Sequence, residues 1–117
     1  MRPLELAQKY MDIVFSTGDF DQLRNILSDD LQFSGPFFNF DSADNYVNSL
    51  RNDPPENFEY EIIKSYADSS SACLVYQFSK PGVSTTMIQT FETIDGKICS
   101  ILLIFDTGAF RPDLKED

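Results

Sequence analysis

The stretch STTMIQTFETIDGKICSILLIF, residues 84–105, contains two apolar runs joined by Asp95-Gly96. Both runs are rich in β-branched and aromatic residues, and Asp-Gly favours a two-residue type I′ hairpin turn. The stretch therefore predicts two antiparallel strands, over 84–94 and 97–105. Two runs of the same kind, 58–66 and 72–79, precede it and predict two more strands, with the turn signal Lys-Pro-Gly at 80–82.

The N-terminal part has helical periodicity instead. Between residues 3 and 17, apolar residues recur at spacings of three and four, and Gly18 follows as a helix stop. Asp19 is placed to cap a second, short helix that ends near Ser28. The sequence thus predicts two consecutive helices before the first strand.

The middle of the chain predicts one strand and one helix. LQFSG, residues 31–35, alternates in polarity and stops at Pro36, which lacks the N–H that a sheet ladder needs. Ser42 is placed to cap a third helix, which Pro54 and Pro55 end. The order of helices, one strand, a helix and an antiparallel meander indicates the α+β class.

The length of 117 residues fits a single domain, residues 1–117, with a C-terminal tail from about residue 107 whose end, RPDLKED, should fray. The formal net charge of −10, from 19 acidic and 9 basic residues, disfavours nucleic acid and anionic membranes as partners. Since the chain contains no long apolar run, we expect a cytoplasmic protein without a membrane segment.

Histidine is absent, and the two cysteines, Cys73 and Cys99, lie in separate strand-like runs. This composition excludes His-based catalytic triads and most zinc sites. We therefore expect no metal and no cofactor, and we interpret both cysteines as small buried apolar residues.

Three stretches carry a resemblance to a known family: QKYMDIVFSTGDFDQL (8–23), LSDDLQFSGP (27–36) and TFETIDGKICSILLIFD (90–106). In their order and separations the chain resembles, from about residue 4 to 106, the NTF2-like superfamily, which includes SnoaL-like polyketide cyclases, ketosteroid isomerase and limonene epoxide hydrolase. The resemblance implies a cystatin-like cone, in which N-terminal helices pack on a curved, mostly antiparallel sheet around an apolar pocket. It also implies that the outer sheet face pairs in a homodimer.

The resemblance assigns catalytic carboxylates to three positions that hold none here. The isomerase base, directly before the proline that ends the first strand, corresponds to Gly35. The isomerase oxyanion-hole acid corresponds to Gln89, and the epoxide-hydrolase Asp on the last strand corresponds to Leu103. The resemblance also makes Asp29 and Asp30 acids of a helix-to-strand corner that face solvent, although a chemical role for them stays open.

Strand alternation extends this pocket. If Gln89 faces inward, Met87 and Phe91 do too, and the last strand contributes Cys99, Ile101, Leu103 and Phe105. We assign the preceding strand's Cys73, Val75 and Gln77 to the same inner face. The expected pocket lining is Tyr10, Val14, Phe33, Gly35, Phe37, Tyr46, Val75, Gln77, Met87, Gln89, Phe91, Ile101, Leu103 and Phe105. Leu74, Tyr76 and Phe78 then form an outer apolar row, which we expect to be a homodimer interface.

Three functions remain open. The first is a protein that binds a small hydrophobic molecule, with Gln89, Gln77, Tyr10 and Tyr46 as polar anchors and without the family's known catalytic carboxylates. The second is a SnoaL-like cyclase or isomerase whose acid has moved to Asp106 or Asp12. The third is a non-enzymatic dimeric interaction module whose cavity is filled by the rings of Phe15, Phe33, Phe37 and Phe91.

Overall fold

The computed structural model of the chain describes residues 1–110, and the RPDLKED segment expected to fray lies outside them. The helices are α1 (Pro3–Asp12), a π-helical turn η1 (Ile13–Thr17), α2 (Phe20–Asn25), α3 (Ala43–Asn52) and a 3-10 turn η2 (Thr107–Phe110). The strands are β1 (Leu27–Ser34), β2 (Asn39–Phe40), β3 (Glu59–Ala67), β4 (Ser71–Lys80), β5 (Val83–Ile94) and β6 (Lys97–Phe105).

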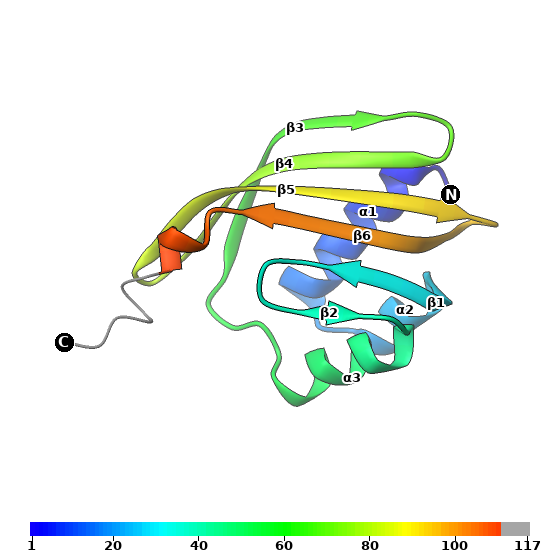
Figure 1. Cartoon of the computed structure of the whole chain (residues 1–117), viewed down its shortest axis with the longest axis horizontal. Coiled ribbons are helices and arrows are strands. Elements are labelled where there is room, and N and C mark those ends of the chain that lie inside the picture. Colours follow the sequence, from blue (N-terminus) through cyan, green and yellow to red (C-terminus); the bar gives the residue numbers. More distant parts are fainter. Residues whose placement is uncertain (111–117) are drawn as a thin grey trace.

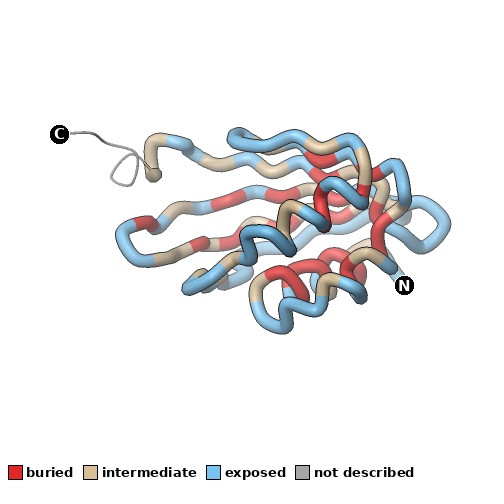
Figure 2. The backbone as a smooth tube through the Cα atoms, turned by 90° about the horizontal axis from the view of Figure 1, so that it is seen from below, coloured by how far each residue is buried: buried red, intermediate tan, exposed pale blue. Residues whose placement is uncertain are grey.

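The six strands form one curved sheet in the order β2-β1-β6-β5-β4-β3 (Figure 1). β1 runs parallel to β6, and every other neighbouring pair is antiparallel. The helices lie on one face of the sheet, and the buried residues gather where the two layers meet (Figure 2). The expected α+β architecture of helices packed on a curved, mostly antiparallel sheet is confirmed.

The local signals for turns and caps have their expected geometry. Asp95 and Gly96 have φ angles of 51° and 76°, the left-handed values that a type I′ turn requires. The Asp19 carboxylate accepts a hydrogen bond from the backbone N–H of Gln22, and the Ser42 hydroxyl accepts one from Asn45. Each cap satisfies a backbone donor that the first helical turn leaves without a partner.

The first strand begins earlier than the sequence predicts, and the second helix ends earlier. The backbone N–H of Ile98 donates to the carbonyl of Ile26 at 2.8 Å, and Leu27 then pairs with Ile98. This pairing with β6 draws residues 27–30 into the sheet and ends α2 at Asn25. The two-residue strand β2 is an addition, because two residues are too few to show a periodicity.

The prediction for the face of β4 is wrong. Leu74, Tyr76 and Phe78 are buried beneath the helices, whereas Cys73, Val75 and Gln77 lie on the outer face and are half-exposed. The register explains the difference, since Leu74 lies directly opposite Gln89, and Tyr76 lies opposite Met87. Directly opposed residues point to the same face of a sheet, and Gln89 faces inward. The expected dimer row is therefore part of the core.

A β-bulge changes the inner face of β6. Thr93 pairs with Ile98 and Glu92 pairs with Ser100, so Cys99 is the additional residue between two ladder positions. Ile98 and Ile101 are buried as a result, and Cys99 is half-exposed rather than buried as expected.

Asp29 and Asp30 are exposed and lie within β1 rather than at a corner. Arg24 binds Asp29 at 2.6 Å and Asp44 at 2.8 Å, and the hydrogen bond from Arg24 lowers the pKa of Asp29. Because the Asp29 side chain is 91% exposed, water screens this pair strongly.

We therefore predict that Asp29→Asn and Asp30→Asn leave both stability and ligand binding unchanged. The measurement is the urea midpoint of each variant beside the unmodified protein. A large fall in the midpoint would show that one of these carboxylates is buried and paired in solution.

Candidate functional site

A cavity of about 350 Å³ lies between the helices and the inner face of the sheet. Its lining is mostly aromatic and aliphatic and comes from α1, η1, β1, β2, α3, the α3–β3 segment, β4, β5 and β6. The lining residues are Tyr10, Val14, Phe15, Phe33, Phe38, Phe40, Tyr46, Ser49, Leu50, Asp53, Pro55, Phe58, Tyr76, Phe78, Met87, Gln89 and Leu103. Phe38 and Asp53 are exposed, which places them at the rim.

The structure brings about half of the expected pocket residues together around this cavity. They are Tyr10, Val14, Phe33, Tyr46, Met87, Gln89 and Leu103. Phe91 and Ile101 are buried on the same sheet face but outside the lining, and Phe91 packs edge-on against Tyr10 with ring centroids 5.2 Å apart. These two residues therefore support the lining from behind.

The other expected residues lie elsewhere. Phe37 and Phe105 pack against each other and against Phe110, beside the cavity rather than in it. Val75 and Gln77 are on the outer face of the sheet, so their assignment to the pocket is wrong, and Gln77 instead bonds Ser84 and Thr86.

Gly35 borders the cavity wall without lining the cavity. A Cβ atom built there would lie 3.3 Å from Cε1 of Phe33 and 3.7 Å from Cβ of Leu103. Leu103 in turn lies directly opposite Gln89 in the sheet. The three positions to which the resemblance assigns carboxylates are thus near neighbours along one wall, and none carries an acid here.

Three phenols and one amide form the buried polar part of the lining, and Ser49 and the rim residue Asp53 are its other polar residues. The Tyr76 hydroxyl donates to Oε1 of Gln89 at 2.8 Å, and the hydroxyls of Tyr10 and Tyr46 share a hydrogen bond. The Gln89 side chain also lies close enough to Tyr10 to lower the pKa of that phenol. Gln89 is 2% exposed and is the buried polar residue of the described core. These four residues, here called the tyrosine cluster, join α1, α3, β4 and β5.

Burial raises the pKa of all three phenols. After burial, the neighbouring Tyr10 raises the pKa of Tyr46 and of Tyr76 further. For Tyr10, the hydrogen bond with Tyr46 and the nearby Gln89 side chain offset part of the increase. The hydroxyls are therefore protonated at neutral pH, and the cluster offers neutral hydrogen-bond groups without charge.

The two displaced acids that the sequence suggested lie outside the lining. Asp12 is exposed on α1, and Asp106 is exposed after β6, where its Oδ1 accepts a hydrogen bond from the backbone N–H of Gly108 at 2.8 Å. Asp53, at the rim, is the single carboxylate among the lining residues. No group of three or more potential metal ligands occurs in residues 1–110, and none of the helices there is long and apolar enough to cross a membrane.

Sequence reasoning missed several lining residues. Tyr76 and Phe78 were missed because alternation alone put them on the opposite face of β4, although the turn length that fixes the register was available. Phe38 lies in a connection, where no periodicity indicates direction, whereas Phe58 begins the predicted strand 58–66 and alternates with Tyr60, so strand periodicity could have identified it. Leu50 shares the apolar face of α3 with Tyr46, so the helical pattern could have identified it.

The sequence matches the SnoaL-like domain family over residues 7–101. An NTF2-like protein of unknown function from Cytophaga hutchinsonii superimposes with a TM-score of 0.80 at 20% identity, covering 98% of this chain and 96% of that one. An LEH-like epoxide hydrolase from M. tuberculosis superimposes with a TM-score of 0.78 at 20% identity, covering 94% of this chain and 86% of that one. A candidate SnoaL-like polyketide cyclase from Shewanella putrefaciens superimposes with a TM-score of 0.78 at 16% identity, covering 96% of this chain and 95% of that one.

A search of curated proteins finds no match. At identities of 20% and below, the solved structures establish a shared fold alone. The sequence match spans most of the chain and includes part of the first helix, all of β1 and most of the final hairpin. The chain therefore belongs to the SnoaL-like domain family and has the NTF2-like fold.

Proposed function

We propose that the protein binds a small, neutral, hydrophobic molecule that carries a hydrogen-bond acceptor such as a ketone oxygen. The observation that supports this most strongly is a cavity of about 350 Å³ with a mostly apolar lining, whose polar groups are the tyrosine cluster, Ser49 and, at the rim, Asp53. Ligand pockets commonly combine an apolar lining with a few converging polar groups. Since Phe15 and Phe33 line this space without filling it, an interaction module with a solid core is disfavoured.

The hydrogen-bond pattern favours a ligand that accepts. Tyr76 uses its proton on Gln89. Within this proposal Tyr46 is the donor of its bond to Tyr10, an assignment consistent with the lowering effect of Tyr46 and Gln89 on the pKa of Tyr10. The proton of Tyr10 then remains for an oxygen in the cavity, because a hydroxyl has one donor and two acceptor positions.

The charge of the cavity favours a neutral ligand. The cluster is uncharged, and no basic residue is among the described lining residues, whereas the exposed carboxylate of Asp53 lies at the rim. Transferring a carboxylate or an ammonium group from water into such a site is costly without a partner of opposite charge. The resemblance supports binding without the family's known chemistry, because Gly35, Gln89 and Leu103 stand where it assigns carboxylates.

The test is a calorimetric titration with matched naphthalenes: 2-acetylnaphthalene, 2-ethylnaphthalene and 2-naphthoate. We predict that the ketone binds about tenfold more tightly than the hydrocarbon, which corresponds to one hydrogen bond of about 1.4 kcal/mol. The carboxylate should bind more weakly than either neutral compound.

Tyr10→Phe should abolish this preference for the ketone, because it removes the donated proton and little volume. Tyr66→Phe is the matched control, since Tyr66 is 55% exposed and lies outside the cavity. Equal affinity of the unmodified protein for the ketone and the hydrocarbon would contradict the proposed recognition. Absence of binding by all three compounds would contradict the proposed function itself.

We also propose that the protein forms a homodimer through the outer face of the sheet, with residues other than those the sequence suggested. The outer face carries a row of cross-strand partners formed by Val75, Ile88 and Ile104. Leu102 lies in the adjacent row. Ile88, Leu102 and Ile104 are 38%, 40% and 48% exposed. These four side chains are uncharged, although Lys64 of β3 lies directly opposite Val75, so two copies of an acidic chain could meet there with little repulsion.

Light scattering over a dilution series tests this interface. We predict a dimer for the unmodified protein and a folded monomer for Ile88→Lys with Ile104→Lys, because the four lysines of two copies would repel one another. Ile94→Lys, at the end of the β5–β6 hairpin, is the control and should remain dimeric. A monomeric unmodified protein at micromolar concentration would contradict this proposal.

A further inference from the structure

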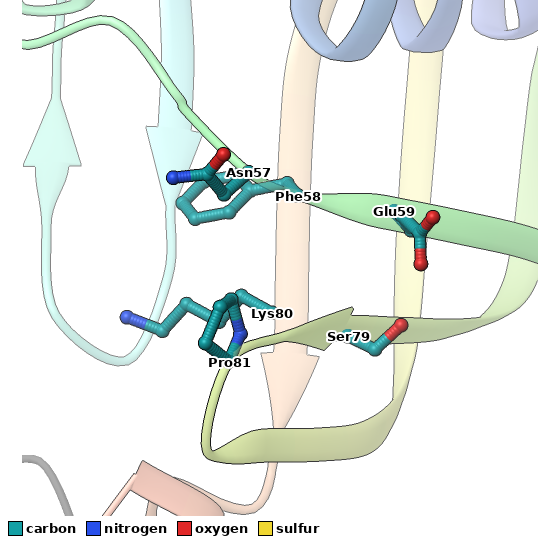
Figure 3. A pocket seen from close by; sticks show the side chains of 6 residues that line it. All are labelled: Asn57, Phe58, Glu59, Ser79, Lys80 and Pro81. Atoms are coloured by element: carbon teal, nitrogen blue, oxygen red, sulfur yellow. The ribbon is translucent and has the colours of Figure 1, made fainter.

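We infer that Phe58 is a side gate of the cavity: its ring stands between the cavity and an outer groove, and its displacement opens a route for ligand beside the rim at Phe38 and Asp53. The outer groove has a volume of about 560 Å³ and is lined by Asn57, Phe58, Glu59, Ser79, Lys80 and Pro81 (Figure 3). Phe58 lines both spaces, and no other described residue does. Its side chain is therefore the partition between them.

Weak contacts hold the ring in its present position. Its centroid lies 5.0 Å from the ring of Phe78 and 6.3 Å from that of Phe15, on the cavity side. On the groove side, Nζ of Lys80 lies over the ring at 5.9 Å from its centroid. Aromatic edge contacts and an ammonium over a ring are each modest interactions, so the closed position is favoured without being locked.

The backbone around Phe58 suits a hinge. Residues 54–58 belong to no helix or strand, and Asn57 has a left-handed φ of 60°. The ladder of β3 begins at the next residue, Glu59, which pairs with Ser79. Phe58 therefore stands between a strand held by hydrogen bonds and a segment without such a ladder, where side-chain and backbone rotation disturbs few contacts.

The groove provides space for the displaced ring. Figure 3 shows Asn57 and Phe58 on one side of it and Lys80 and Pro81 on the other. A ring turned into the groove would join the two spaces and leave the tyrosine cluster open to solvent. In the closed position it would instead keep water away from these phenols. That this motion admits a ligand rests on the proposed function, whereas the motion itself is testable without one.

Thiol accessibility tests the gate directly. In a Cys73→Ser, Cys99→Ser background, Met87→Cys places a thiol in the cavity lining, where Met87 is 4% exposed. The rate of its modification by neutral methyl methanethiosulfonate is measured by mass spectrometry. We predict a rate at least about tenfold higher with Phe58→Ala and an intermediate rate with the more conservative Phe58→Leu. Phe37→Ala, a partly exposed ring outside the lining, is the control and should leave the rate unchanged.

The second measurement is the stopped-flow rate of binding of N-phenyl-1-naphthylamine, which should rise with Phe58→Ala and stay the same with Phe37→Ala. Equal modification rates for the protein that retains Phe58 and for its Phe58→Leu and Phe58→Ala variants would overturn the gate even if the probe binds. Accelerated modification together with no binding of 2-acetylnaphthalene, 2-ethylnaphthalene or 2-naphthoate would support the gate and contradict the proposed function.

Discussion

Replacing Tyr76 by Glu together with Phe78 by Lys is expected to unfold the protein. Tyr76 is 1% exposed and donates to Gln89, and Phe78 is 5% exposed and packs between Phe15, Phe58 and Phe110. The double substitution places two charged groups in this core, and each buried substitution of this kind costs about 4 kcal/mol or more. The sum of about 8 kcal/mol or more is comparable to the whole net stability of about 5–15 kcal/mol of a typical domain.

The measurement is far-ultraviolet circular dichroism, followed by a urea titration if any structure remains. The matched control is Val75→Glu with Gln77→Lys, which places the same charges on the same strand but on its outer face. This control should remain folded. A folded monomer from the Tyr76 and Phe78 variant would show that these side chains face outward, as strand alternation alone suggested.

Raising the pH above about 10 is expected to destabilise the protein steeply, because Tyr10, Tyr46 and Tyr76 have raised pKa values in the folded state. In the unfolded chain the same phenols lose their protons near pH 10. Above that pH the folded state therefore binds more protons, and the free energy of unfolding falls as the pH rises. Three such groups together give a slope of about 4 kcal/mol per pH unit.

Urea titrations between about pH 9 and 12, with ultraviolet detection of tyrosinate, measure this slope. Tyr46→Phe should reduce the number of linked protons from about three to about two. A protein that stays folded while these three phenols titrate near their ordinary pKa would contradict the burial of the tyrosine cluster.

Local sequence signals predicted local structure well. Asp95-Gly96, Asp19 and Ser42 each act through partners within four residues, so a single sequence contains all the information that they need. The inward face of β4 was not predicted correctly, because both of the alternating sets of side chains on this strand contain apolar residues. Alternation alone therefore could not distinguish inside from outside.

The register of the β4–β5 pair determines which face of β4 points inward. A two-residue turn at Pro81-Gly82 pairs Lys80 with Val83, and the ladder continued from there places Leu74 opposite Gln89. Since Gln89 faces inward, the turn length and the cross-strand rule together would have turned Leu74 inward as well.

Other parts of the site depend on contacts that no local pattern contains. The bulge at Cys99 follows from pairing between β5 and β6, and Phe38 reaches the cavity from a connection. Helical periodicity still identified Tyr10 and Tyr46, and the family resemblance identified Gln89. The sequence thus predicted most of the polar cluster and about a third of the apolar lining.

The most direct test of the proposed function uses the methionine methyl groups. The chain has three methionines: Met87 lines the cavity, Met11 is buried in the core, and Met1 is 65% exposed. In a titration of ¹³C-methyl-labelled protein with 2-acetylnaphthalene, the ring current of the bound naphthalene should shift the Met87 signal strongly, and the Met1 signal should stay in place. The same titration of the Tyr10→Phe variant should require about tenfold more ketone to reach the same shift. An unchanged Met87 signal at saturating ketone would contradict a ligand site in this cavity.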